Sequence, residues 1–345
     1  MDVSLTYEQL EWQDAVARLA AAHATTGADP IDASGARGWA SVVELGIPAL
    51  RSPELSGVDA AGVESALAVE QAGRSLTTVP IVGQAVIAPE LLAAAGAHET
   101  VAAVAEGALR IAPALRADLT DLAVLGEPSV AFDAAGATHA LLLTDDPEDR
   151  RVVAVELDGD DRDGLDLTRS LVTVSPGAPV AALDIGGPIA EDRLDRVRAV
   201  AMTAIAADLL GVMSGAVDEA VRYALDRHQF GQPIGGFQAV QHLLADAAVA
   251  VEGARSCVWH AAWAGDHEEI DDALLAARVA KAYASAAGLR VVESTVQIFG
   301  GIAITWEHLS HVRLRRVHLD RVALGDEHVH HRAIAAARLD AGRVA

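Results

Sequence analysis

The 345-residue sequence contains one cysteine, Cys257, and one lysine, Lys281. A single cysteine excludes a disulfide framework within the chain and favours a reducing compartment, so we expect a cytoplasmic protein. The neighbours of Cys257 in "GARSCVWHAAWA" are apolar, which predicts a buried, unreactive thiol rather than a nucleophile. Aromatic residues make up only 3% of the chain.

Long apolar runs and excess positive charge are also missing. No uncharged apolar run approaches the roughly 20 residues of a membrane span, so none is expected. The opening "MDVSLTYEQLEWQD" is acidic and polar, unlike a secretory signal. The formal net charge of -23 argues against nucleic acid and anionic membranes as general partners. A local arginine cluster could still bind an anionic ligand.

The pattern along the chain predicts a mainly α protein with a central β domain, an α+β fold in three parts. Residues 1–108 show apolar positions at helical spacing and form a predicted helical domain. Residues 109–186 carry short β-rich runs between acidic and Gly/Pro turns, which favours a small antiparallel sheet. Residues 187–345 hold long helical patterns with short links, typical of a four-helix bundle. The β-rich runs are "DLAVLG", "HALLLTDD", "RRVVAVELDG", "SLVTVSPG" and "PVAALDIGG".

Two unusual segments interrupt the helices of the last part. The first, "DRHQFGQPIGGFQAVQHLLAD" at 226–246, places a cation, amides and a ring around a Gly/Pro break. The second, "VQIFGGIAITWEH" at 296–308, has two consecutive glycines after a helix. Guanidinium groups bind diphosphates well, and glycine lets a backbone approach a ligand closely because no Cβ intervenes. Taken alone, however, each segment could be an ordinary turn or helix cap.

These two segments, their spacing and the domain order resemble the acyl-CoA dehydrogenase family. Weaker similarity extends to "LTYEQLEWQDAVARL", "ELGIPALRSPELSG" and "ALAVEQAGRSL", so the resemblance covers essentially the whole length. It implies FAD as cofactor, an acyl-CoA substrate and removal of two hydrogens across the α–β bond. A glutamate takes the α-proton in this family, and the flavin takes the β-hydride. Electron-transfer flavoprotein is the implied electron acceptor.

The resemblance also implies which residues contact FAD. In the family, subunits assemble into tetramers, and the bundle of one subunit completes the flavin pocket of its neighbour. The first segment reaches the adenylate half, and the second approaches the ribose and pyrophosphate. The implied cofactor-binding residues are Arg227, Gln229, Phe230, Gln238, Gln297, Gly300 and Gly301.

The sequence departs from the family where the catalytic base is expected. One position for the glutamate lies about two dozen residues after the Gly-Gly pair and falls on Leu324. The other lies 29 residues before Phe230 and falls on Ala201. Neither side chain can accept a proton, so no catalytic residue is assigned. Asp208 and Asp326 lie near these positions and are the only alternatives considered.

The β domain departs from the family as well. The family's "T-E-P-x-x-G-S-D"-like segment, which holds the flavin ring and the thioester, is absent, and Phe132 is the only aromatic residue of 109–186. The chain thus keeps the parts that serve a neighbour's flavin and lacks those that serve its own. It resembles the short subunit of actinobacterial α2β2 enzymes, several of which act on CoA thioesters of steroid side chains. The implied partner is a longer acyl-CoA dehydrogenase subunit.

Two other readings stay open at this point: a self-sufficient homotetramer with a displaced base, and a non-catalytic scaffold. Neither the acyl group nor the partner can be read from the sequence. His308 and His311 share a helical face near Glu307, a spacing that zinc sites use. The same run recurs in the family without metal, so we expect no metal site. "PIGGF" lacks a preceding strand, which argues against nicotinamide binding.

Overall fold

The computed structural model describes residues 4–27, 38–157, 164–174 and 185–341. It consists mainly of α-helices with one small five-stranded sheet between them in the sequence, which confirms the predicted fold class. The domain limits at 108 and 186 stay predictions. The last predicted β-rich run, "PVAALDIGG", lies mostly outside the described residues.

The N-terminal part is helical, as the spacing predicted. Thr6 caps the first helix, because its side chain accepts a hydrogen bond from the Gln9 N–H and Gln9 bonds back to the Thr6 N–H. The elements are α1 (Tyr7–Ala22), α2 (Trp39–Glu44), η1 (Ile47–Ala49), α3 (Pro53–Ser56), α4 (Gly62–Arg74), the π-helical η2 (Ile81–Ile87), α5 (Ala88–Ala94) and α6 (His98–Ala105).

The sheet is mixed rather than antiparallel, which corrects the expectation. Its strands follow the order β4-β3-β1-β2-β5, and the β1–β3 pair is parallel. Strand β2 runs opposite to β1, and β3 reverses again before pairing with the other edge of β1, so β3 must point the same way as β1. The strands are β1 (Ile111–Arg116), β2 (Ser129–Phe132), β3 (His139–Leu143), β4 (Val152–Glu156) and β5 (Leu171–Val174).

Three of the predicted β-rich runs contain strands β3, β4 and β5. The run "DLAVLG" forms only isolated bridges at Leu122 and Val124. Strands β1 and β2 were not predicted: the two alanines and Pro113 of β1 are poor strand formers, and β2 is only four residues long.

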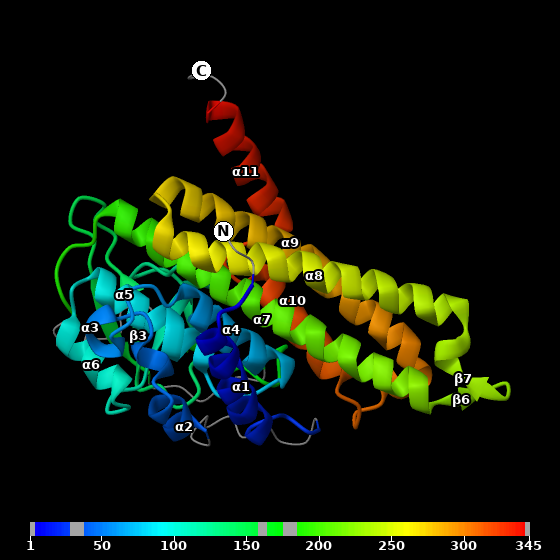
Figure 1. Cartoon of the computed structure of the whole chain (residues 1–345). Coiled ribbons are helices and arrows are strands. Elements are labelled where there is room, and N and C mark those ends of the chain that lie inside the picture. The colour runs from blue at the N-terminus through cyan, green and yellow to red at the C-terminus, as the bar shows by residue number, and fades with distance from the viewer. Residues whose placement is uncertain (1–3, 28–37, 158–163, 175–184, 342–345) are drawn as a thin grey trace.

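Three long helices run side by side along the molecule, with the β6–β7 hairpin at one end (Figure 1). The shorter α10 packs against α7 and α9 and completes the predicted four-helix bundle, whereas α11 contacts α9 and projects away from the body. The elements are α7 (Glu191–Asp226), β6 (His228–Gln229), β7 (Gln232–Pro233), η3 (Ile234–Gly236), α8 (Gln238–His267), α9 (Ile270–Phe299), η4 (Gly300–Ile304), α10 (Ser310–Val322) and α11 (Glu327–Ala341).

Helix α7 is the centre of the core. Every residue from 201 to 216 is buried, and small side chains dominate this stretch. A Cβ on Gly211 would clash with the carbonyl oxygen of Glu70, and a Cβ on Gly73 would clash with that of Asp208. These glycines let the backbones of α4 and α7 approach each other closely, and the approach fixes the N-terminal helices on the bundle.

Two helical segments, 191–226 and 270–304, have the length and apolar composition of a membrane span. The prediction of no membrane span was based on uncharged apolar runs alone, so it did not detect these two segments. The most apolar window of α7 is 89% buried inside the protein, so its contacts are those of a core helix. The corresponding window of 270–304 is 44% buried.

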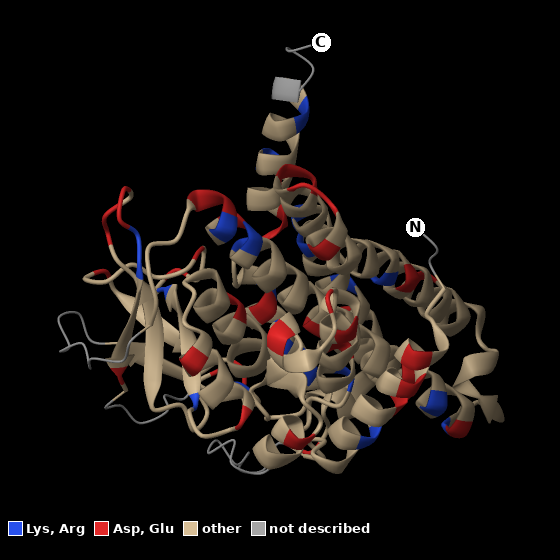
Figure 2. Cartoon of the chain, turned by 60° about the vertical axis from the view of Figure 1, so that its left-hand side comes forward, with Lys and Arg blue, Asp and Glu red and all other residues tan. Residues whose placement is uncertain are grey.

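Acidic residues are spread over helices and loops in all parts of the chain (Figure 2). No single acidic face dominates in this view, which agrees with the dispersed Asp and Glu of the sequence. Such a distribution is typical of a solvated surface.

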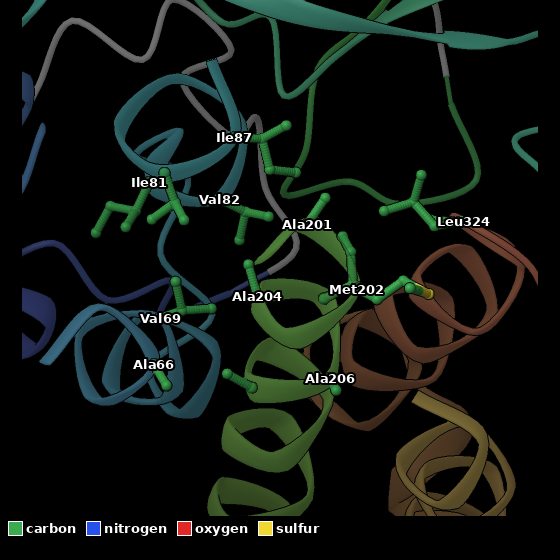
Figure 3. Close-up of a cluster of buried hydrophobic side chains, with 14 of the residues drawn as sticks. Ala66, Val69, Ile81, Val82, Ile87, Ala201, Met202, Ala204, Ala206 and Leu324 are labelled. Carbon is green, nitrogen blue, oxygen red and sulfur yellow. The ribbon is translucent and has the colours of Figure 1, made fainter. Parts of the chain in front are cut away.

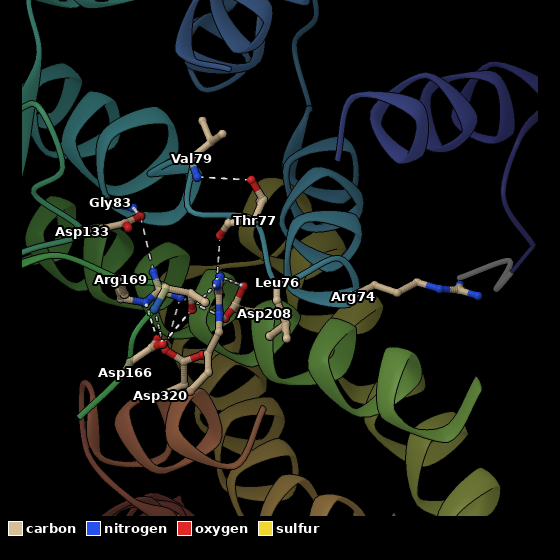
Figure 4. A network of polar contacts seen from close by, with 12 residues as sticks. Arg74, Leu76, Thr77, Val79, Gly83, Asp133, Asp166, Arg169, Asp208 and Asp320 are labelled. Carbon is tan, nitrogen blue, oxygen red and sulfur yellow. Dashed lines mark hydrogen bonds and ion pairs between the residues drawn. The ribbon is translucent and has the colours of Figure 1, made fainter. Parts of the chain in front are cut away.

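A buried cluster of charges joins the sheet region to the helices (Figure 4). Arg316 of α10 binds Asp208 of α7 through two hydrogen bonds of 2.7 Å, and Arg169, just before β5, donates to the same carboxylate at 2.9 Å. Arg316 also donates to the Thr77 carbonyl at 3.0 Å. Arg169 lies 3.4 Å from Asp133, which accepts a hydrogen bond from a backbone N–H of η2. The cluster therefore connects four separate parts of the chain.

The pKa values of the buried Asp208 and Asp320 are shifted in opposite directions within this cluster. Burial raises the pKa of Asp320 well above its usual range and outweighs the nearby Arg169. Burial opposes ionisation of Asp208 too, but Arg316 and Arg169 hold the pKa of that carboxyl well below its ordinary value. Asp320 is therefore the carboxyl that keeps its proton, whereas Asp208 is ionised.

The two aspartates should respond differently to amidation. Asp208→Asn removes the charge that two buried guanidiniums require and should lower the free energy of unfolding by about 3–5 kcal/mol. Asp320→Asn keeps a neutral donor in place and should change that free energy by less than about 1.5 kcal/mol. Denaturant titration of both variants checks the contrast, and equal losses would contradict the assignment of the proton.

The same pair predicts a pH effect. Above about pH 4 the unfolded chain releases the Asp320 proton, whereas the folded protein retains it. The unfolded state then binds fewer protons, so Asp320 makes stability fall as the pH rises from about 4 towards its raised pKa. The Asp320→Asn variant should lack this fall in stability. The free energy of unfolding, measured across the same pH range for the variant and the wild type, checks the prediction.

Candidate functional site

The two segments singled out in the sequence meet at one end of the bundle. Helix α7 ends there, the hairpin and η3 follow, α8 begins, and α9 ends in η4. One small apolar cluster, distinct from the main core, joins these elements through Ala220, Ile298, Phe299 and Ala303. Tyr223, Ile234 and Val240 pack against it. Residues 70 positions apart in the chain are thereby held on one structural unit, which we call the bundle end.

The hairpin carries the most exposed large apolar side chain found in the described residues. Gln229 pairs with Gln232, so Phe230 and Gly231 form a two-residue turn, with φ of 53° and 82°. Positive φ at both positions is the type I′ geometry that suits a hairpin. A phenylalanine is rare there, and the conformation costs on the order of 1 kcal/mol. The Phe230 ring is 93% exposed.

The polar residues of the bundle end face solvent. Arg227, Gln229, Gln238 and Gln297 are all exposed. Gln229 donates to the carbonyl of His228, but the side chains of Arg227, Gln238 and Gln297 make no hydrogen bond or ion pair with any residue that the structure describes. A guanidinium and two amides are therefore available to a ligand or a neighbouring subunit.

Gly300 has a backbone conformation that requires glycine. Its φ of 64° and ψ of -138° lie in a region closed to residues with a Cβ, and its N–H caps α9 by donating to the Val296 carbonyl. The N–H is thus already used within the chain, so Gly300 offers close approach rather than a free donor. Gly301 is also exposed, and a Cβ there would meet no atom within 4 Å.

The expected positions of the catalytic base lie in an apolar cluster (Figure 3). Ala201 is fully buried and Leu324 is nearly so, and both belong to the main core with Met202. No carboxylate occupies either position. A cavity beside this turn of α7, lined by Ala199, Thr203 and Ala204 among others, measures about 20 Å³, room for about one water molecule.

The turn between α10 and α11, which contains Leu324, contacts the β region. The Leu324 N–H donates to the carbonyl of Leu119 at 2.6 Å, and both leucines have positive φ, 60° and 62°. The Lys281 amine also binds this turn, donating to the carbonyls of Arg321 and Gly325. Both leucines thus have backbone angles that favour glycine. Such a conformation persists only where the surrounding contacts stabilise it.

Neither alternative base is placed for proton transfer. Asp208 is fully buried and paired with Arg316 and Arg169. Asp326 caps α11 by accepting from the N–H groups of His328 and Val329, and the hydrogen bond from Val329 holds the pKa of this aspartate below its usual value. A carboxylate used in these ways is a weak base.

The histidines of the "TWEHLSH" run have partners other than a metal. His308 Nδ1 accepts from the Ser310 N–H at 3.1 Å, and His311 stacks on Trp306 with ring centroids 4.9 Å apart. The described residues contain no group of three potential ligands. Cys257 is partly buried, and burial raises the pKa of its thiol, which disfavours the nucleophilic thiolate.

Comparison with known proteins identifies the family. The family description "Acyl-CoA dehydrogenase, C-terminal domain" matches residues 186–339. The acyl-CoA dehydrogenase IpdE2 of Mycolicibacterium smegmatis is 30% identical over 284 residues, covering 82% of this chain and 81% of that protein. The chain belongs to the acyl-CoA dehydrogenase family. Members of this family are oxidoreductases that use FAD.

One further relative is longer than this chain, and two solved structures share its fold. The acyl-CoA dehydrogenase FadE34 of Mycobacterium tuberculosis is 34% identical over 81% of this chain, but the chain spans only 39% of FadE34. A variant of the Tcur3481–Tcur3483 steroid ACAD has a TM-score of 0.82 at 25% identity, over 97% of this chain and 99% of that one. A chain of the ChsE4–ChsE5 complex from Mycobacterium tuberculosis shares the fold, with a TM-score of 0.80 at 22% identity and coverage of 97% and 98%.

Sequence reasoning missed the residues that hold the bundle end together. Tyr223, Phe299 and His308 form a ring column inside it, and Glu219 lies beside them. A signal was present: five of the chain's twelve aromatic residues lie in this small region. In so aromatic-poor a sequence, that concentration marks the bundle end.

The two glycines of "QIFGG" provide a matched test of the geometry. Gly300→Ala forces a Cβ into a forbidden backbone region and should lower the free energy of unfolding by about 1–3 kcal/mol or displace η4. Gly301→Ala meets open space and should change stability by less than about 0.5 kcal/mol. Denaturant unfolding of the two variants distinguishes them, and a neutral Gly300→Ala would mean that the loop adopts another conformation.

Proposed function

We propose that this chain is a subunit of a flavin-dependent acyl-CoA dehydrogenase that completes the FAD site of a longer partner in an α2β2 tetramer. The observation that carries the proposal is a contrast between two places. Phe230 is 93% exposed, and the side chains of Arg227, Gln238 and Gln297 form no hydrogen bond or ion pair with the described residues. The positions for a base are filled by Ala201 and Leu324 in the core.

Each residue of the bundle end has a chemical role in this proposal. Arg227 neutralises and hydrogen-bonds a phosphate of the FAD held by the partner. Gln229, Gln238 and Gln297 supply amide donors and acceptors for its polar groups, and Phe230 covers an apolar ring face. Gly300 and Gly301 let the backbone approach the pyrophosphate. Bound there, FAD would supply the hydride acceptor, and the partner chain would supply the carboxylate for the α-proton.

The substrate class rests on the relatives. The Tcur3481–Tcur3483 protein is named a steroid ACAD, and its hyphenated name pairs two gene products. By this similarity we propose an acyl-CoA with a steroid-derived or branched acyl group as substrate. Electron-transfer flavoprotein remains the proposed acceptor, and the cytoplasm the proposed location.

A self-sufficient enzyme finds less support from the geometry. Its two candidate bases, Asp208 and Asp326, are both engaged in structural hydrogen bonds. A non-catalytic scaffold would have no use for a strained, exposed phenylalanine beside an unpaired arginine. The heteromeric subunit therefore accounts for both the exposed and the buried features.

Expression alone and together with the partner separates the three readings. We expect the chain alone to purify without flavin, and the co-expressed complex to be yellow and to oxidise acyl-CoA. Absorbance at the flavin maximum and the mass of the assembly are the measurements. A yellow, active single chain would support the self-sufficient enzyme, and a complex without flavin would support the scaffold.

Within the complex, Arg227→Ala should weaken FAD binding by about tenfold or more, because a charge-assisted hydrogen bond is lost. Arg222→Ala is the matched control: Arg222 lies in the last turns of α7, shortly before Arg227, and is exposed without a hydrogen bond or ion pair among the described residues. FAD dissociation measured by fluorescence checks both. Equal FAD retention in the two variants would assign Arg227 another role.

A further inference from the structure

A column of three rings fills the interior of the bundle end. The Tyr223 ring of α7 meets Phe299 of α9 edge-on, with centroids 5.1 Å apart and planes at 61°. On its other side Phe299 contacts His308, with centroids 4.5 Å apart. The three rings come from the last turn of α7, the last residue of α9 and the segment before α10. They therefore connect the end of α7, the end of α9 and the segment that leads into α10.

His308 is fixed from three directions. Its Nδ1 accepts from the backbone N–H of Ser310, which can only donate, so the ring proton must reside on Nε2. That Nε2 faces Glu219 of α7 at 3.9 Å, and Glu219 lies 3.4 Å from the largely buried Arg313. The ring cannot rotate without losing the helix cap at Ser310. This arrangement makes His308 a rigid part of the column rather than a mobile side chain.

The column lies directly behind the predicted cofactor contacts. Tyr223 is one helical turn before Arg227, and its carbonyl accepts the Arg227 N–H at 2.8 Å. Phe299 immediately precedes Gly300, where the backbone takes its glycine-only conformation. The contact between Tyr223 and Phe299 thus determines how far Arg227 stands from the Gly-Gly backbone. A dinucleotide that touches both must match this separation.

We propose that the column Tyr223–Phe299–His308 is the spacer that sets the distance between the two FAD-binding segments, with His308 as a positioning residue. The proposal rests on the proposed function, because it concerns the same FAD site. His308 does not touch the cofactor. It acts by holding the Phe299 ring and the start of α10, and so the Gly300–Gly301 loop between them.

Two variants separate the ring from the hydrogen bond. In His308→Asn, a side-chain oxygen can still accept from Ser310, because asparagine bonds readily to the backbone N–H two residues on, but the ring contact with Phe299 is lost. In His308→Phe the ring remains and the cap is lost. The control is His267→Asn, which removes a comparable ring stack: Trp263 and His267 have centroids 4.9 Å apart at the opposite end of α8.

The measurement is the rate of FAD dissociation from the co-purified complex, at equal tetramer content and equal midpoint of thermal unfolding. His308→Asn should accelerate FAD loss by about tenfold or more, as expected when a supporting residue is removed from a binding site. His308→Phe should have a smaller effect, and His267→Asn should leave the rate unchanged. A residue with only a structural role would change assembly and melting, but not FAD retention in the tetramers that form.

The outcomes separate this proposal from the one on which it rests. A wild-type complex without flavin refutes the proposed function itself. Flavin in the wild-type complex, with an unchanged dissociation rate in His308→Asn, refutes only the spacer. Failure of both His308 variants to assemble refutes the spacer as well, because His308 would then be needed for assembly alone.

Discussion

The pairing of Arg316 and Arg169 with Asp208 is the interaction on which the rest of the structure depends. All three side chains are buried, and a charge left unpaired in a protein interior costs several kcal/mol. The three residues must therefore stay together. Arg316 belongs to α10, Arg169 to the segment before β5, and Asp208 to α7. Their pairing therefore fixes the sheet region on the bundle. Asp320 adds a proton, which lowers the negative charge that the cluster must hold.

The middle of α7 and the chain around its C-terminal end differ in exposure to solvent. Residues 201–216 are buried on every side, whereas most residues from 221 to 230 are exposed. Ala201 is fully buried in this stretch, and its neighbour Leu324 is tied to Leu119 through the backbone. The exposed half ends in a strained hairpin whose phenylalanine gains little from this chain. Exposed apolar side chains beside unpaired polar ones are typical of a surface that another molecule covers.

The sequence was sufficient for features that depend on local pattern. Helical spacing predicted the helices, and the position of Gly300 after α9 follows from the preference of helix ends for glycine. Counting from the two motifs placed Ala201 and Leu324 without a carboxylate, and the structure places both in the core. Strands β1 and β2 were missed because β1 contains Pro113 and two alanines and β2 is short, so that pairing with neighbouring strands stabilises them.

Features that depend on distant contacts could not be predicted in this way. Asp208 and Arg316 are 108 residues apart, and nothing in their local sequence indicates that they pair. The ring column likewise joins Tyr223 to residues some 80 positions later. An alignment of the two motifs therefore identifies the exposed contacts, but the elements that position those contacts emerge only from the packing of α7, α9 and α10.

The buried half also shows why a single substitution would not restore an independent active site. A glutamate at Ala201 or Leu324 would enter an apolar cluster, where burial raises the pKa of a carboxyl group and destabilises the fold. The Leu119–Leu324 contact and the Arg–Asp cluster would still hold the surrounding backbone and α7 in place. Those contacts stabilise the very fold that presents the bundle end. The buried stretch of α7 and the rings of Tyr223, Phe299 and His308 at its exposed end therefore contribute to one fold through separate contacts.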